Sequence, residues 1–193
     1  MRPANQIRLR LSLRNGRWLL ASVALLALCL FTPVASLQTE AVTKVGKLPK
    51  ESVAQIRLTT TDGQQFSLAS LRGKVVVLDF FGVHCAHSRD HLRETMTQFT
   101  NEDFNRGLQI IGIESEGSTP QRVQEFIKDE KINYPVAQID EATFVRFVES
   151  QDLSAPQTLI YGRDGKLLLH SMGHGAKTQA AIRDTIQKAL SKN

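Results

Sequence analysis

Cysteine is scarce in this sequence of 193 residues, which contains only Cys29 and Cys85. Because Cys29 lies in an apolar N-terminal segment, Cys85 is the single thiol of the remaining chain and has no partner for an internal disulfide. This excludes a small secreted domain stapled by disulfides. The glycine patterns that bind nucleotide phosphates, G-x-G-x-x-G and G-x-x-x-x-G-K-[ST], are also missing. We therefore expect no nucleotide and no other bound cofactor.

Acidic residues are missing from the first 39 positions, although the whole chain carries a net charge of +5. Five of the 24 basic residues lie in this segment: Arg2, Arg8, Arg10, Arg14 and Arg17. The other 19 basic residues equal the 19 acidic residues in number, so the rest of the chain is formally neutral. Basic charge confined to one end does not indicate nucleic-acid binding, and no nucleic acid is expected among the partners.

The arginines are followed by residues 18–37, which carry no charge and are long enough to cross a membrane as a helix. A basic stretch before an apolar core is typical of a signal peptide or an uncleaved signal anchor, and residues 1–37 are predicted to be one of the two. Small residues at 34–36 suit cleavage by a signal peptidase, so both outcomes stay open. Because the positive end stays in the cytoplasm, we expect an extracytoplasmic protein, periplasmic if bacterial. It is then either released or anchored to the inner membrane.

The folded domain is expected to span residues 52–193, after a polar linker at residues 38–51. Alternating polar and apolar residues around Asp62-Gly63 predict an N-terminal β-hairpin. Apolar runs predict strands at 75–81, 108–113 and 134–137, with a second hairpin at 157–170. Helical spacing of apolar residues predicts helices at 85–99, 120–127, 142–148 and 178–190. This order predicts an α/β fold with a central mixed sheet flanked by helices.

Cys85 is predicted to lie where the strand at 75–81 meets the next helix. Free N–H groups and the positive end of a helix dipole stabilise a thiolate there, and the thiolate is the nucleophile of disulfide exchange. His84 and His87 flank the cysteine and stabilise the thiolate further when they are protonated. A lone cysteine is often only a small buried apolar residue. The polar, histidine-rich surroundings favour the reactive interpretation.

The segment around Cys85 resembles the thioredoxin superfamily. Asp79-Phe80-Phe81, followed by Gly82-Val83-His84-Cys85-Ala86-His87-Ser88, is similar to the D-F-W and C-x-x-C motifs of that superfamily. The stretches LASLRGKVVVLDFFG and SAPQTLIYGRDGKLLLH resemble its membrane-tethered extracytoplasmic branch, the TlpA/ResA-type thiol–disulfide oxidoreductases or redoxins. The resemblance covers about residues 52–190 and implies a thioredoxin-like fold.

The resemblance also implies roles for individual residues. Cys85 matches the attacking cysteine, and Asp79 matches a buried acidic residue that acts in proton transfer. Pro156 matches the cis-proline that faces the nucleophile, and Ala155 precedes it where the backbone of a substrate pairs. His84 and His87, beside Cys85, are candidate substrate-binding residues together with Ala155.

Several positions depart from the pattern of the superfamily. Ser88 replaces the second cysteine, so the motif is C-x-x-S. The other departures are His84 for tryptophan, His87 for proline, His91 for a common glutamate, Arg93 for a common proline and Gln157 for threonine.

The loss of the second cysteine changes the expected reaction, because the hydroxyl of Ser88 cannot release a product by internal attack. Ser88 is instead expected to donate a hydrogen bond to the Cys85 thiolate. We expect an atypical single-cysteine oxidoreductase that forms mixed disulfides with protein or small-molecule thiols and disulfides. An external reductant thiol would then release them. This chemistry suits disulfide isomerisation, removal of small-thiol adducts or holding of a client.

Two alternative functions compete with this interpretation. A non-catalytic binding or copper-handling module could use Cys85, His87 and His91, which form a C-x-H-x-x-x-H pattern with sulfur and imidazole ligands. Ligands from a single helical turn seldom close a site, and histidines on a helix surface are usually solvated, so no metal is expected. A single-cysteine peroxidase would need Pro at the position of Leu78 and Thr or Ser at that of Gly82. His170 and His174 are interpreted as surface residues.

Overall fold

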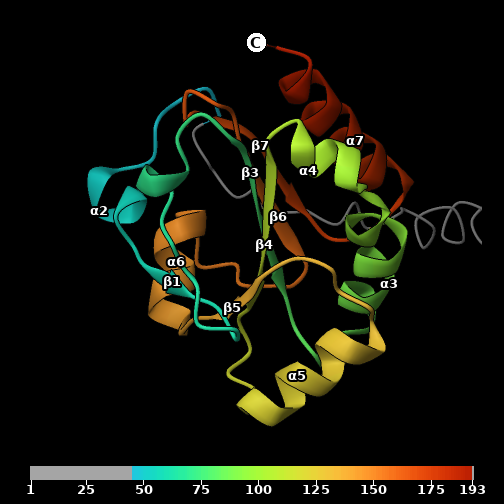
Figure 1. Cartoon of the computed structure of the whole chain (residues 1–193). Coiled ribbons are helices and arrows are strands. Elements are labelled where there is room, and N and C mark those ends of the chain that lie inside the picture. The colour runs from blue at the N-terminus through green and yellow to red at the C-terminus, as the bar shows by residue number, and fades with distance from the viewer. Residues whose placement is uncertain (1–44, 193) are drawn as a thin grey trace, which may run out of the picture. The chain divides into compact units, whose positions relative to one another are not determined.

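The computed structural model describes residues 45–192, and its centre is a five-stranded sheet in the order β5-β4-β3-β6-β7 (Figure 1). The strands are β3 (Val75–Phe81), β4 (Leu108–Glu114), β5 (Val136–Gln138), β6 (Gln157–Tyr161) and β7 (Leu167–Met172). β3, β4 and β5 run parallel, whereas β6 is antiparallel to β3 and β7 is antiparallel to β6. The sheet is therefore mixed, as predicted.

The predicted N-terminal hairpin is present as β1 (Leu58–Thr59) and β2 (Gln65–Phe66). Its turn contains Gly63 at a φ of 82°, a conformation that glycine adopts without a steric penalty. An isolated bridge between Thr60 and Ala137 connects the hairpin to β5.

The central strand β3 is buried along its whole length, because helices cover both faces of the sheet. Side chains alternate along a strand, so Val77 and Phe81 enter one core cluster while Leu78 and Phe80 enter the other. Asp79 therefore points to the face of Val77 and Phe81, although its neighbours in sequence are apolar.

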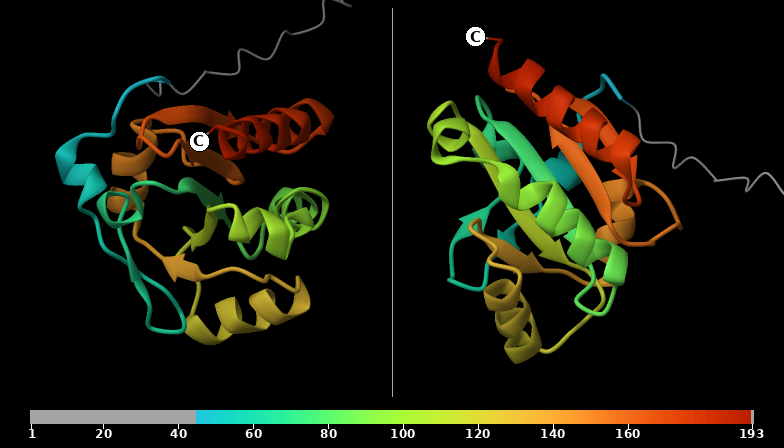
Figure 2. Two further views of the ribbon diagram at one scale, coloured as in Figure 1. Left: turned by 45° about the horizontal axis from the view of Figure 1, so that its top comes forward. Right: turned by 90° about the vertical axis from the view of Figure 1, so that its right-hand side faces the viewer.

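Helices cover the two faces as the α/β prediction requires. The face of Val77 packs against α3 (Ala86–Glu94), α5 (Pro120–Asp129) and α7 (Ala176–Leu190), which Figure 2 (right) shows lying on one side of the strands. The opposite face packs against α2 (Glu51–Ala54), the 3-10 turn η2 (Ala69–Leu71) and α6 (Glu141–Val148). The chain thus leads from the end of β3 directly into α3, which covers the face of Val77.

The predicted helix from Cys85 through Phe99 is wrong at its carboxyl end. α3 stops at Glu94, because Thr95 adopts φ −123° and ψ −59°, outside the helical range. A 3-10 turn η3 (Met96–Gln98) and the short helix α4 (Asn101–Asn105) follow. Apolar residues keep helical spacing across the break, so spacing alone could not reveal it. The signal was a capping box at α4, in which the Thr100 N–H donates to Asp103 Oδ2 at 3.0 Å.

The predicted signal segment at 1–37 lies outside the described residues, as does the first half of the predicted linker at 38–51. The described part of that linker contacts the domain, since the Gly46 N–H donates to Leu167 O at 2.7 Å and the Leu167 N–H donates to Lys47 O at 2.9 Å. Within residues 45–192, the structure contains no helix with the length and apolar character needed to span a membrane.

Candidate functional site

Cys85 lies at the junction between β3 and α3. Its backbone carbonyl accepts the first hydrogen bond of the helix, from the Arg89 N–H at 3.3 Å, and its own N–H donates to Gly82 O at 3.2 Å. The side chain is half-buried and is not part of a disulfide. Its Sγ lies 3.5 Å from the carbonyl oxygen of Ala155. The thiol is therefore open to solvent on one side and lies at the positive end of the α3 dipole.

The loop that faces Cys85 precedes β6 and contains the Ala155–Pro156 peptide, which is cis. The antiparallel register that pairs Phe80 with Gln157 brings this loop to the end of β3. Gln157 also holds the loop in place, because its side-chain amide donates to Asp152 O at 2.8 Å and to Ser154 O at 2.9 Å. The structure thus brings Cys85, Ala155 and Pro156 together from segments 70 residues apart.

Ser88 does not make the expected hydrogen bond to Cys85. Its side chain is fully buried, and its hydroxyl accepts a hydrogen bond from the backbone N–H of Gly82 at 3.2 Å. The reason is the helical geometry: residue 88 begins the inner face of α3, together with His91 and Leu92. Ser88 therefore fixes the loop before Cys85.

Asp79 is fully buried and belongs to a cluster of three polar side chains from three elements. Its Oδ1 lies 3.0 Å from His91 Nε2 and accepts a hydrogen bond from the hydroxyl of Thr158 at 3.1 Å. Thr158 is the direct cross-strand partner of Asp79 in the register of β3 and β6. No sequence signal pointed to Thr158, because the register between strands separated by 79 residues is a tertiary property.

The interpretation of His91 as a solvated helix-surface residue was wrong, since its side chain is completely buried against Asp79. His87 is exposed, so these two residues of the C-x-H-x-x-x-H pattern do not share an environment. Among residues 45–192, no group of three or more His, Cys, Asp or Glu side chains is arranged to hold a metal ion.

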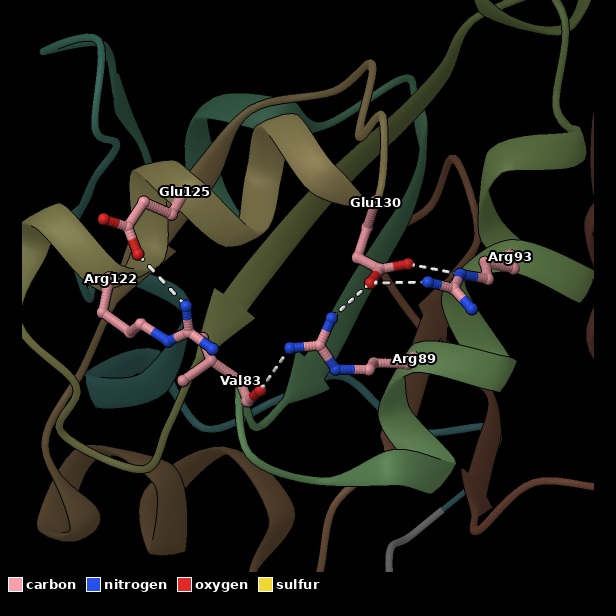
Figure 3. A network of polar contacts seen from close by, with 6 residues as sticks. All are labelled: Val83, Arg89, Arg93, Arg122, Glu125 and Glu130. Atoms are coloured by element: carbon pink, nitrogen blue, oxygen red, sulfur yellow. Dashed lines mark hydrogen bonds and ion pairs between the residues drawn. The ribbon is translucent and has the colours of Figure 1, made fainter.

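A buried carboxylate fastens α3 to the end of α5. Glu130 receives hydrogen bonds from Arg93 Nε at 2.6 Å and from Arg93 Nη2 at 3.0 Å, and it also pairs with Arg89 (Figure 3). Arg89 reaches further, donating to the carbonyl of Val83 at 3.1 Å and lying over the ring of Phe126. Both arginines thus connect α3 to the end of α5, and Arg89 also holds the loop before Cys85, roles that the sequence did not indicate.

A second carboxylate lies beside the same loop. Glu116 accepts a hydrogen bond from the His84 N–H at 3.3 Å, and its carboxylate occupies the space that a Cβ would need at Gly82. A side chain at position 82 would therefore collide with it. The buried Glu114 shapes this turn by accepting from the Glu116 N–H at 3.0 Å. His84 and His87 are exposed on either side of Cys85.

The interpretation of His170 and His174 as surface residues was wrong. His170 is half-buried on β7 and lies 2.8 Å from Gln157 Oε1, and burial lowers the pKa of its ring. The side chain of His174 is only 13% exposed and lies against α3. His170 lies within β7 and His174 in the turn between β7 and α7, and their burial depends on packing that sequence spacing did not reveal.

Comparison with known proteins gives the family. The model of the AhpC/TSA family matches residues 49–169, which is more than half of the chain. Thiol-disulfide oxidoreductase ResA from Bacillus cereus is 27% identical over 122 residues, covering 63% of this chain and 68% of ResA. NHL repeat-containing protein 2 from Gallus gallus is 31% identical over 131 residues, covering 65% of this chain. The chain spans only 18% of the length of that chicken protein.

Solved structures give the same fold. A putative protein disulfide isomerase from Bacteroides thetaiotaomicron superposes with a TM-score of 0.67 at 23% identity, covering 78% of this chain and 92% of that one. At this level of identity the similarity concerns the fold alone, and the thioredoxin-like fold expected from the sequence is confirmed.

Proposed function

The chain belongs to the AhpC/TSA family, in the ResA-like branch of the thioredoxin superfamily, and from this premise we propose that it performs thiol–disulfide exchange through Cys85 alone. The proposed reaction begins when the Cys85 thiolate attacks one sulfur of a client disulfide. One S–S bond breaks, another forms between Cys85 and the client, and the total number of electrons is unchanged. The thiolate that leaves takes up one proton, which balances the proton that Cys85 gave up.

The observation that carries the proposal is the place of the Cys85 sulfur. It is half-buried at the N-terminus of α3, and it lies 3.5 Å from the backbone of Ala155. An extended client segment that pairs with the backbone at Ala155 would bring its own sulfur close to Cys85 without a particular client sequence. His84 and His87, which are exposed and flank Cys85 in the sequence, would border this approach.

The C-x-x-S motif gives the reaction its proposed monothiol character. Position 88 holds a hydroxyl that is buried against Gly82, so no second thiol lies on the first turn of α3. The mixed disulfide would then persist until an external thiol attacks it. Protein and small-molecule thiols are the proposed partners, and isomerisation or removal of small-thiol adducts are the reactions that need no second cysteine.

The N-terminal segment supports a proposed site of action outside the cytoplasm. Basic residues followed by the uncharged stretch at 18–37 are typical of an export signal or anchor. In a bacterium, the domain would then work in the periplasm, either free or tethered to the inner membrane. Fractionation of cells that express the full chain, with and without residues 1–37, tests this part of the proposal.

Mixed-disulfide capture tests the reaction itself. The purified protein is incubated with a peptide that contains one internal disulfide, and the products are resolved by mass spectrometry. We expect a persistent adduct on Cys85, no adduct on Cys85→Ser, and release of the adduct by added glutathione. Ser88→Cys should instead free the reduced peptide and form an internal disulfide between positions 85 and 88.

Two results would contradict the proposal. The first is a wild-type protein that forms no adduct although its Cys85 is reduced. The second is an equimolar copper ion bound to the wild-type protein without adduct formation, which would support the non-catalytic alternative.

A further inference from the structure

A row of polar side chains leads from the buried Asp79 to the surface between α3 and α7. Exposure rises along the row: the side chains of Asp79 and His91 are 0% exposed, that of His174 is 13% exposed, and that of Glu94 is 59% exposed. The residues come from β3, α3 and the turn between β7 and α7. A buried carboxyl without access to water would exchange its proton slowly. This row of side chains connects Asp79 to the solvent-exposed Glu94.

The inner contacts fix how the ring of His91 is used. Its Nε2 lies 3.0 Å from Asp79 Oδ1 and 3.2 Å from the hydroxyl of Thr158. Because a carboxylate is an acceptor, this geometry favours a proton on Nε2. The other nitrogen, Nδ1, is buried and has no hydrogen-bond partner within the described residues.

His174 makes a similar contact at the outer end of the row, where its Nε2 faces an exposed carboxylate. His174 Nε2 lies 3.3 Å from Glu94 Oε2, which also accepts a hydrogen bond from the side chain of Gln179 at 2.7 Å. The Nδ1 of His174 is buried and likewise without a partner in the part of the chain that the structure describes. The two rings meet edge to face, with centroids 6.1 Å apart. Each ring is therefore anchored through Nε2 and keeps its Nδ1 in the interior between α3 and α7.

We propose that His91 and His174, joined by one water molecule between their Nδ1 atoms, form the route by which Asp79 exchanges its proton with solvent. Buried polar atoms are almost always hydrogen-bonded, and an internal water commonly supplies the missing partner. This inference rests on the proposed function and deepens it, because it assigns to two histidines the supply of protons to Asp79, the residue that the resemblance to the thioredoxin superfamily assigns to proton transfer. His91 and His174 are positioning residues in this role, since they act through Asp79.

The transfer conserves protons at each ring. To protonate Asp79, His174 with its proton on Nδ1 takes a second proton from solvent at Nε2 and gives the Nδ1 proton to the water. The water gives a proton to Nδ1 of His91, and His91 gives its Nε2 proton to Asp79. Both rings change tautomer, the water keeps two protons, and the reverse transfer restores the starting state. Tyr134 is the other ionisable group that faces Asp79, but burial, and then the charge of Asp79, raise the pKa of its phenol well above the ordinary value. Tyr134 therefore keeps its proton and does not compete.

Solvent exchange of the ring protons tests the route directly. NMR of the protein labelled with ¹⁵N-histidine measures how fast the Nε2 proton of His91 exchanges with water. His174→Phe keeps a ring for the edge-to-face contact but removes both nitrogens, and we expect exchange to slow at least tenfold. His174→Ala should slow exchange similarly, and free imidazole in the buffer should restore it. His170→Gln, at another half-buried histidine of the same region, is the matched control and should leave exchange unchanged.

A second readout connects the route to the reaction. The pH profile of mixed-disulfide formation at Cys85 should change in His174→Phe and should depend on buffer concentration, whereas the profile of His170→Gln should match the wild type. If His174→Phe is poorly folded, His174→Gln replaces it, with the same expectation.

The outcomes separate this inference from the proposed function. Unchanged exchange at His91 in His174→Phe, or equal slowing in His170→Gln, would overturn the proton route. Slowed exchange in a protein whose Cys85 captures no disulfide would support the route and contradict the proposed function instead.

Discussion

Ser88 stabilises the turn before Cys85 at a position where the C-x-x-C motif has a reactive cysteine. Its hydroxyl accepts the hydrogen bond of the Gly82 N–H in the buried turn before Cys85. A buried N–H without a partner costs about 1–3 kcal/mol, and the sulfur of a cysteine accepts hydrogen bonds only weakly. Serine thus suits the structure of this turn better than the second cysteine of a C-x-x-C motif, whereas the cysteine would suit a dithiol reaction.

The position of Cys85 predicts a reactive thiol. The first N–H groups of α3 have no partner within the helix, and together with the helix dipole they stabilise a negative charge on Sγ. We therefore expect iodoacetamide to modify Cys85 at pH 6 about tenfold faster than a cysteine in a short unstructured peptide. Mass spectrometry measures both rates of modification. Unfolding the protein in urea should remove the difference. Modification at the rate of the peptide would contradict a nucleophilic role.

At the scale of elements, α3 is held by contacts on its two sides. Its inner face packs on the sheet through His91 and Leu92, and its flank is fastened to α5 by Glu130. The carboxylate of Glu130 is fully buried, while Arg89 is 28% exposed and Arg93 is 58% exposed. Removing the charge of Glu130 should therefore cost less than removing the charges of Arg89 and Arg93. The arginines can regain hydration when their partner is lost, whereas the buried carboxylate cannot.

This asymmetry predicts an order of stabilities. Glu130→Gln should lower the free energy of unfolding by only about 1–2 kcal/mol, since the partly exposed arginines regain hydration and such pairs are weak. The double variant Arg89→Met and Arg93→Met leaves an uncompensated buried carboxylate and should cost about 3–5 kcal/mol. Urea unfolding measures both, with Arg122→Met, which affects only an exposed pair on α5, as the control. A larger loss of stability in Glu130→Gln than in the double arginine variant would contradict this account of how Glu130 holds α3.

At the scale of the whole molecule, the mixed sheet determines where the site lies. β3 and β4 are parallel, so their carboxyl ends, followed by Cys85 and Glu116, lie at the same edge. β6 is antiparallel to β3, so its beginning, preceded by Pro156, lies at that edge too. Three loops far apart in the sequence therefore converge on the thiol.

The stability of the molecule should depend on pH through His170. Burial lowers the pKa of this ring in the folded state, whereas the unfolded chain titrates near the ordinary value of about 6.5. Below about pH 6.5 the unfolded state binds the proton first, so its stability relative to the folded state increases. As the pH decreases below this value, the free energy of unfolding should therefore decrease, by at most about 1.4 kcal/mol per pH unit. The decrease ends at the pH where the folded state also binds the proton.

Urea unfolding between pH 5 and pH 8 measures this dependence, and His170→Gln should flatten it. The carboxyl of Asp140 titrates in a different window. Hydrogen bonds from Thr143 lower its pKa, so its contribution is present above about pH 4 and is lost only below it. A fall between pH 7 and pH 5 that persists in His170→Gln would contradict the assignment to His170.

The alternation of strands and helices, and the position of Cys85 between them, could be predicted from local patterns in the sequence. This was possible because hydrophobic periodicity, turn residues and the order of motifs are local properties of the chain. The sequence also indicated Asp79 and Pro156, through a resemblance carried by short linked motifs. Where local signals compete, as at Thr95, the helix boundary could not be predicted.

Which polar side chains meet depends on long-range packing and could not be predicted from the sequence. Thr158 contacts Asp79 because of the register between β3 and β6, and Glu130 pairs with Arg89 because α5 packs beside α3. His91 was expected on the surface, yet its ring fills the space between α3 and the sheet, and His174 closes that space from the turn before α7. Such contacts join residues dozens of positions apart, and no local pattern encodes the packing that brings them within hydrogen-bond distance.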